Sequence, residues 1–208
     1  MPHPGLVLAS TSPRRAELLR ALGLRARVVA PRVDENGRRD ESPDEHVLRL
    51  AEAKARAAAA GLAAAPGDVV LGADTVVVKG STVLGKPADA ADAERMLRLL
   101  RGSTHEVLTA VCLVRTDDRR SARALERSRV RFRAYDDETI RRYVSSGEAR
   151  DKAGAYAIQG LGALLSLGIE GSWSNVVGLP LEILPELFAA VGVDLWDLIE
   201  PGPGKPNG

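Results

Sequence analysis

Asp68-Val-Val-Leu-Gly-Ala-Asp-Thr-Val-Val-Val-Lys-Gly-Ser-Thr-Val-Leu84 is the stretch around which the fold is organised. Its first part, 68–74, is typical of a buried strand that ends on a carboxylate. Its second part, 75–84, continues as a hairpin that turns at Gly80. We therefore expect Asp74 to lie at the end or bend of a strand and to be partly buried. A carboxylate in such a position needs a cation or hydrogen-bond donors as partners.

The rest of the chain predicts helices and further strands around this stretch. Short apolar runs predict strands, whereas apolar residues at helical spacing, preceded by capping residues, predict helices. The other expected strands are 5–9, 106–115 and 124–134. The expected helices are 13–22, 44–62, 89–101, 136–144 and 179–191. The glycine-rich segment 147–171 predicts loops and short strands, and the order of elements along the chain is mixed α and β.

Composition places the chain among ordinary globular proteins. It has 208 residues, of which 45% are apolar and 27% charged, and its formal net charge is +1. Because no general positive surface exists for a long polyanion, we do not expect nucleic acid as the main ligand. Small phosphorylated molecules stay open as ligands. We expect one domain over residues 1–200 and a flexible tail, rich in proline and glycine, over residues 201–208.

Neither secretion nor a membrane partner is expected. The apolar residues 6–9 are too few for a signal peptide, and no apolar run approaches the ~20 residues that span a bilayer. The single cysteine, Cys112, lies in the apolar run 109–114, which predicts a buried strand. We therefore interpret Cys112 as structural and expect a cytoplasmic protein.

Ser10-Thr-Ser-Pro-Arg-Arg15 joins the first expected strand to the first expected helix. Hydroxyl groups, free backbone N–H groups and two guanidinium groups at a helix start outline an anion-binding site. From this hexapeptide alone a simpler interpretation is favoured, in which Ser12 caps the helix and the arginines are solvated. The motif indicates an anion site only in combination with others.

Carboxylates and lysines elsewhere in the chain offer the other parts of a phosphate site. Asp74 suits a metal ion or a cation as partner, although backbone N–H groups at a strand bend would also satisfy it. Glu35, in Val33-Asp-Glu35, adds a hard oxygen ligand suited to Mg²⁺ or Mn²⁺, with a solvated charge pair as the alternative. Lys54 and Lys86 offer point charges for phosphate oxygens, whereas most lysines stay in water.

Other patterns narrow the chemistry. The three histidines, His3, His46 and His105, lack the spacing of zinc ligands, and no Walker-type phosphate loop is present. Asp151-Lys-Ala-Gly-Ala-Tyr-Ala-Ile-Gln-Gly160 combines polar groups with small residues that permit a ligand to approach the backbone. A plain glycine-rich connection is the alternative for this segment.

Taken together, these motifs resemble those of the Maf nucleotide pyrophosphatase family. Leu8-Ala-Ser-Thr-Ser-Pro-Arg-Arg-Ala-Glu-Leu-Leu19 is similar to the opening signature of that family. Further similar motifs follow in order along nearly the whole chain: Val33-Asp-Glu35, Ala53-Lys-Ala55, Gly72-Ala-Asp-Thr-Val76, Gly85-Lys-Pro87, Thr104-His-Glu-Val107, Asp151-Lys-Ala-Gly-Ala-Tyr156, Ile158-Gln-Gly160 and Asn175-Val-Val-Gly-Leu-Pro-Leu181. The resemblance implies an α/β fold of the Maf/Ham1-like, inosine triphosphate pyrophosphatase-like kind. Such a fold has two lobes, a mixed sheet flanked by helices and a central cleft, and it commonly forms a homodimer.

The resemblance also implies a reaction and a role for each site residue. The family hydrolyses nucleoside triphosphates to a monophosphate and pyrophosphate with a divalent cation, Mg²⁺ or Mn²⁺. Asp74 matches the catalytic residue that acts as general base on water, and Glu35 and Asp74 match metal ligands. The residues that match substrate and phosphate ligands are Ser10, Ser12, Arg14, Arg15, Lys54 and Lys86.

Base preference is implied by three positions. Arg14, Thr75 and Gln159 are similar to the pyrimidine-directed branch, which acts on dTTP and UTP in a house-cleaning role that extends to modified pyrimidine nucleotides. A side-chain amide suits uracil or thymine because it offers both a donor and an acceptor. Two alternatives stay open: an enzyme of the same fold directed to 7-methyl-GTP or purines, and a non-catalytic regulator of septum formation.

Overall fold

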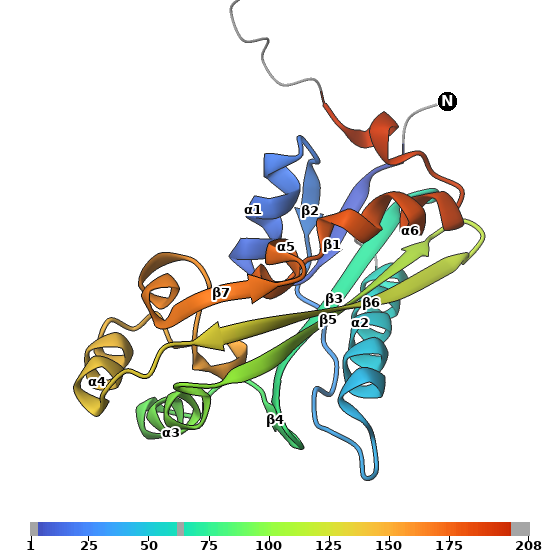
Figure 1. Cartoon of the computed structure of the whole chain (residues 1–208). Coiled ribbons are helices and arrows are strands. Elements are labelled where there is room, and N and C mark those ends of the chain that lie inside the picture. Colours follow the sequence, from blue (N-terminus) through green and yellow to red (C-terminus); the bar gives the residue numbers. More distant parts are fainter. Residues whose placement is uncertain (1–3, 62–64, 201–208) are drawn as a thin grey trace, which may run out of the picture.

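The computed structural model describes residues 4–61 and 65–200, and its centre is one seven-stranded mixed sheet flanked by helices (Figure 1). The strands are β1 (Leu6–Ala9), β2 (Ala26–Val28), β3 (Val69–Lys79), β4 (Thr82–Leu84), β5 (Thr104–Arg115), β6 (Ser121–Phe132) and β7 (Ser166–Glu170). The α-helices are α1 (Pro13–Ala21), α2 (Pro43–Ala60), α3 (Ala90–Leu100), α4 (Asp137–Ser145), α5 (Trp173–Val177) and α6 (Leu184–Ala190). The short 3-10 helices are η1 (Ala153–Ala155), η2 (Gly160–Leu165), η3 (Leu181–Ile183) and η4 (Leu195–Leu198). The expected α/β class is confirmed.

β3 is the strand around which the sheet is built. The strand order is β2-β1-β3-β5-β6-β7, and β4 also pairs with β3. On one edge of β3, β1 runs parallel along residues 69–72 and β4 runs antiparallel along residues 77–79. Between these two, residues 73–76 have no strand partner on that edge within the described ranges. Three residues of this interval, Asp74, Thr75 and Val76, line a cavity.

The predicted end of the strand at Asp74 is wrong. β3 runs without a break because β5 pairs with it antiparallel from residue 69 to residue 78. The predicted turn at Gly80 is confirmed, and its φ of +60° is a left-handed conformation that glycine adopts at low cost. Asp74 thus lies in mid-strand, two residues beyond the last residue of β3 that pairs with β1.

Alternate residues of β3 face two separate cores. Odd-numbered residues such as Leu71 pack into the larger core with side chains of α1, α3, α4 and α6. Even-numbered residues such as Val76 pack against α2 on the other face of the sheet (Figure 1). Because successive strand residues point to opposite faces, Asp74 faces α2 and Thr75 faces α1. Two neighbouring residues therefore collect partners from different helices.

Gly72 lets α2 lie directly on the sheet. A Cβ atom at Gly72 would lie 2.6 Å from the backbone nitrogen of Ala55 and would also collide with the carbonyl oxygen of Ala51. The helix itself begins with a capping box between Ser42 and Glu45. The close approach of α2 to β3 brings Lys54 within reach of Asp74.

Other differences from the predicted elements have local causes. The predicted helix over 179–191 is wrong in its first part, since Pro185 lies in the first turn of α6 and cannot continue a helix from further upstream. β2 and α5 were not predicted because three and five residues are too few to show a periodic pattern. The predicted end of the second helix at Leu62 and the tail 201–208 lie outside the described residues. No helix in the described ranges is long and apolar enough to cross a membrane.

Candidate active site

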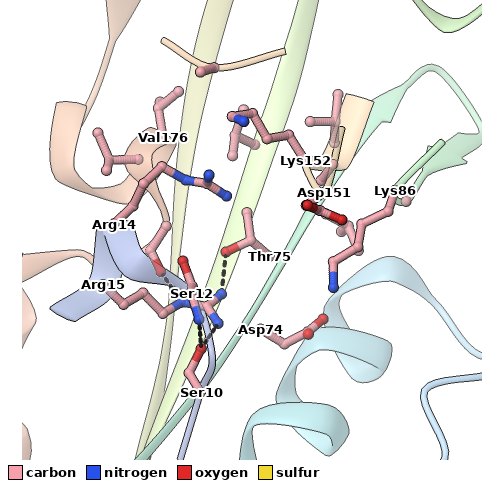
Figure 2. Close-up of a pocket in the computed structure, with 18 of the residues that line it drawn as sticks. Ser10, Ser12, Arg14, Arg15, Asp74, Thr75, Lys86, Asp151, Lys152 and Val176 are labelled. Atoms are coloured by element: carbon pink, nitrogen blue, oxygen red, sulfur yellow. Dashed lines mark hydrogen bonds between the residues drawn. The ribbon is translucent and has the colours of Figure 1, made fainter. Parts of the chain in front are cut away.

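A cavity of about 700 Å³ opens beside the unpaired interval of β3, beyond the carboxyl end of β1 (Figure 2). Open α/β sheets commonly bind ligands at this place, and the volume suits a small molecule. The cavity brings together every residue that the sequence predicted for the site: Ser10, Ser12, Arg14, Arg15, Glu35, Lys54, Asp74, Thr75, Lys86 and Gln159.

Two carboxylates in the cavity converge on one ammonium group. Lys54 Nζ lies 2.7 Å from Asp74 Oδ1 and 2.6 Å from Glu35 Oε1. Lys54 and Asp74 are only 7% and 9% exposed, whereas the side chain of Glu35 is half exposed. Burial would raise the pKa of Glu35, but the hydrogen bond and charge of Lys54 outweigh it and lower that pKa. Glu35 is therefore held in its charged form at neutral pH.

The same two carboxylates are the groups that fit a divalent cation. No cluster of three or more His, Cys, Asp or Glu side chains suited to a metal occurs among the residues described. Glu35 and Asp74 nevertheless meet around a positive charge and are hard oxygen ligands. Mg²⁺ is usually held by one or two carboxylates together with substrate phosphates and water. The residues present fit a metal that binds together with a phosphorylated ligand.

Arg15 is buried and holds the floor of the cavity together. Its Nε donates to the carbonyl oxygen of Gly178 at 2.7 Å. Its Nη1 donates to Ser10 Oγ and its Nη2 to Thr75 Oγ1, both at 3.0 Å (Figure 2). Burial lowers the pKa of Arg15, and the charge of Asp74 acts against that effect. The guanidinium group thus links α1, β3 and the end of α5, with all three nitrogens donating to protein oxygens.

The hydroxyl of Thr75 belongs to a directed chain of hydrogen bonds. Thr109 Oγ1 donates to the carbonyl oxygen of Asn175 at 3.0 Å, so its own proton is occupied. The 2.9 Å contact between Thr75 and Thr109 must then use the proton of Thr75. The Thr75 hydroxyl consequently accepts a hydrogen bond from Arg15 and donates one to Thr109. Its hydroxyl proton is not available to a ligand in this arrangement.

Three cations enter the cavity from different segments, namely Arg14 on α1, Lys86 after β4 and Lys152 before η1 (Figure 2). Burial lowers the pKa of Arg14, partly offset by Asp151. Burial and then the charge of Arg14 lower the pKa of Lys152. Positive charges that repel each other are stabilised by an anionic ligand that binds between them. Lys152 is not among the residues predicted for the site. Its position directly after Asp151, in a glycine-rich motif, was the feature of the sequence that could have indicated it.

The N-terminus of α1 adds partial positive charge to the same space. Ser12 occupies the predicted N-cap position, but its side chain makes no capping hydrogen bond. Its backbone N–H instead donates to Ser10 Oγ at 3.2 Å, and Pro13 follows in the first turn. A helix start without a side-chain cap leaves N–H groups and the helix dipole directed at an anion.

A backbone contact ties two of the cationic loops together. The N–H of Gly154 donates to the carbonyl oxygen of Gly85 at 3.0 Å, which joins the Lys86 loop to the Lys152 loop. Gly154 has a φ of +69°, and a Cβ atom there would lie 2.9 Å from a methyl group of Val77. Glycine is therefore required at this position, and the two lysines are held on one side of the cavity.

Comparison with known proteins agrees with this geometry. The model of the family described as Maf-like protein matches residues 5–191. A dTTP/UTP pyrophosphatase of Moorella thermoacetica is 52% identical over 191 residues, which cover 92% of this chain and 97% of the relative. Proteins of the same name from Symbiobacterium thermophilum and Anaeromyxobacter sp. (strain Fw109-5) are each 49% identical, covering 92% and 97% of this chain and 96% and 95% of the relatives. The resemblance seen in the motifs is confirmed, and the chain belongs to the Maf-like protein family.

Proposed function

We propose that this protein hydrolyses dTTP and UTP, and modified pyrimidine nucleotides of the same kind, to a nucleoside monophosphate and pyrophosphate. The observation that carries the proposal is the cavity in which the pair Glu35 and Asp74 faces a set of cations from three segments. Several relatives that are about half identical along nearly their full length bear the name dTTP/UTP pyrophosphatase, which supports the choice of bases.

The cations and the helix start would bind the triphosphate. Arg14, Lys86 and Lys152 would neutralise its oxygens, while Ser10 and Ser12 at the start of α1 would add hydroxyl and backbone donors. As the reaction proceeds, negative charge gathers on the oxygen that bridges the α- and β-phosphorus atoms and on the leaving pyrophosphate. Positive charge held in place before the reaction stabilises that change without reorganisation.

Asp74 would act as the general base. Its Oδ1 is held by Lys54 at 2.7 Å, which orients the carboxylate and leaves Oδ2 to accept a proton from water. The water oxygen would form a bond to the α-phosphorus as the bond from that phosphorus to the bridging oxygen breaks. The products are the nucleoside monophosphate and pyrophosphate, and the proton goes to Asp74.

Glu35 and Asp74 would also hold a divalent cation, Mg²⁺ or Mn²⁺, once the nucleotide is bound. Such an ion supplies charge neutralisation at the phosphate oxygens. Lys54 would keep the two carboxylates close together when no nucleotide is present. Arg15 would act indirectly, by fixing Ser10 and Thr75.

Gln159, Arg14 and Thr75 would select the base. Gln159 lines the cavity, and its side chain makes no capping hydrogen bond to η2, so its amide can pair with uracil or thymine. The occupied hydroxyl proton of Thr75 leaves that residue to offer only its lone pair and its methyl group to a base.

A homodimer in the cytoplasm is part of the same proposal. Four large apolar residues are 46–71% exposed, namely Leu161, Leu164, Leu167 and Trp173. Leu167 lies in β7 at the edge of the sheet, and the other three lie close to β7 in sequence. An exposed apolar group at a sheet edge favours association with a second copy. Light scattering should give twice the mass of the chain, and a Leu164→Glu variant should give the mass of one chain.

The test is pyrophosphate release from dTTP, UTP, CTP, dATP, GTP and 7-methyl-GTP, each with Mg²⁺, with Mn²⁺ and with EDTA. Metal-dependent release led by dTTP and UTP is the expected result, with Asp74→Asn as the inactive control. A preference for 7-methyl-GTP or for purines would refute the base assignment. Absence of release from every nucleotide would refute the enzyme and favour the regulator of septum formation.

A further inference from the structure

We propose that Glu148 and Tyr143 are positioning residues that set base selection by holding the loop that carries Gln159. This inference rests on the proposed function, because it assumes that Gln159 contacts the base. Neither Glu148 nor Tyr143 lines the cavity, whereas Gln159 does. The two residues therefore act from behind the loop and not on the nucleotide.

Glu148 binds the loop through backbone N–H groups. Its Oε2 accepts from the N–H of Leu161 at 2.9 Å, and its Oε1 accepts from the N–H of Gly162 at 2.9 Å. Tyr143 also donates its hydroxyl to Glu148 Oε1 at 3.1 Å. A carboxylate that receives three hydrogen bonds holds its partners firmly, since hydrogen bonds to charged groups are stronger than neutral ones.

Tyr143 holds the other end of the same loop. The backbone N–H of Ala157 donates to the hydroxyl oxygen of Tyr143 at 3.1 Å. Tyr143 is 4% exposed, and burial raises the pKa of its hydroxyl, so the group stays protonated and can accept from Ala157 while it donates to Glu148. Residues 158–160, with Gln159 at their centre, are thus fixed on both sides by one connected pair of side chains.

Two glycines allow the loop to reach this anchor. Gly160 has a φ of +62°, and a Cβ atom there would lie 2.6 Å from Glu148 Oε2. A Cβ atom at Gly162 would lie 2.9 Å from the Tyr143 hydroxyl and would collide with the carbonyl oxygen of Ala157. The backbone path on either side of Gln159 is therefore specified by contacts with Glu148 and Tyr143.

The experiment compares kcat and KM for UTP and GTP in Glu148→Gln, Tyr143→Phe and Gln159→Ala. Glutamine at position 148 has only one oxygen that can accept a hydrogen bond. Its NH₂ group would face one of the two loop N–H groups, so that hydrogen bond is lost. We expect KM for UTP to rise about tenfold in Glu148→Gln, with kcat within about twofold of the unaltered protein and the UTP-to-GTP ratio of kcat/KM reduced about tenfold. Tyr143→Phe, which keeps the charge of Glu148, should change the ratio in the same direction.

A double variant separates positioning from any other role. If Glu148 acts through Gln159, Glu148→Gln should reduce the UTP-to-GTP ratio no further in a Gln159→Ala background. Glu138→Gln is the matched control, because Glu138 is an exposed carboxylate on α4 that pairs only with Arg141 and Arg142 in the described structure. The inference is overturned if Gln159→Ala changes the UTP-to-GTP ratio of kcat/KM but Glu148→Gln and Tyr143→Phe do not. The proposed function would still stand in that case.

Amide hydrogen exchange gives a readout that does not depend on turnover. The N–H groups of Leu161 and Gly162 should exchange at least tenfold faster in Glu148→Gln than in Glu138→Gln. Equal exchange in the two variants would overturn the anchoring. If the unaltered protein hydrolyses no nucleotide, the proposed function is refuted. Base selection by this loop is then refuted as well, because it assumes that function.

Discussion

Replacing Lys54 by methionine tests the ion pairs at the centre of the site. Methionine keeps most of the volume and apolar length of lysine but removes the ammonium group that bridges Asp74 and Glu35. Asp74 is 9% exposed, and its carboxylate would lose the only side-chain hydrogen bond that it makes within the described residues. An isolated carboxylate with so little access to water is costly.

The expected cost follows from burial. Removing one partner of a buried ion pair costs roughly 3–5 kcal/mol of unfolding free energy. Because the pair borders the cavity and Glu35 is half exposed, we expect the lower end, about 3 kcal/mol, at pH 7. The double variant Lys54→Met/Asp74→Asn should recover about 1 kcal/mol or more of that loss, since it leaves no buried charge without a partner.

Urea unfolding followed by circular dichroism measures these values. Lys86→Met is the matched control, because Lys86 also lines the cavity but is exposed. Its unfolding free energy should stay within about 0.5 kcal/mol of the unaltered protein. A Lys54→Met variant that is as stable as Lys86→Met would refute the reasoning that Lys54 holds the two carboxylates.

Further predictions concern turnover, packing and pH. Asp74→Asn should keep its fold and lose at least about a hundredfold in kcat for UTP, and near-normal turnover would remove Asp74 from the mechanism. Gly72→Ala should lose about 2 kcal/mol in urea unfolding and most UTP turnover because α2 must move, whereas Gly37→Ala, where a Cβ meets nothing within 4 Å, should change neither. Burial, and to a smaller extent the charge of Lys79, lowers the pKa of His105 to about 4. Between about pH 6.5 and pH 4, His105 is therefore protonated in the unfolded chain but neutral in the folded chain. The free energy of unfolding therefore falls as the pH falls through that window, and this loss should be about 3 kcal/mol smaller in His105→Phe than in the unaltered protein. Identical dependence of unfolding free energy on pH in the two proteins would contradict the lowered pKa of His105.

The residues predicted for the site line one cavity, but the contacts between them could not be predicted from the sequence. Each motif marks a residue type at a fixed place in the chain, and the fold brings all of these places to one cavity. The motifs predict Lys54 and Arg15 as phosphate ligands, and in the structure Lys54 bridges two carboxylates while Arg15 donates to three protein oxygens. Such pairings depend on which face of β3 each helix covers, and no local pattern contains that information.

The fold could be predicted where local pattern and tertiary context agree. The hairpin at Gly80 and the long helix α2 follow from turn chemistry and apolar spacing. The predicted end of the strand at Asp74 is wrong because a carboxylate is typical of a strand end, whereas here β3 stays paired with β5 on both sides of Asp74. Lys54 supplies the charge that makes a carboxylate tolerable in mid-strand.

The most direct measurement is the hydrolysis of UTP in ¹⁸O-labelled water with Mg²⁺, followed by mass spectrometry of both products. Water that attacks the α-phosphorus places the label in UMP and leaves pyrophosphate unlabelled, which is the result we predict. Label in pyrophosphate, or release of orthophosphate with UDP, would contradict attack at the α-phosphorus and the pyrophosphatase reaction proposed for this cavity.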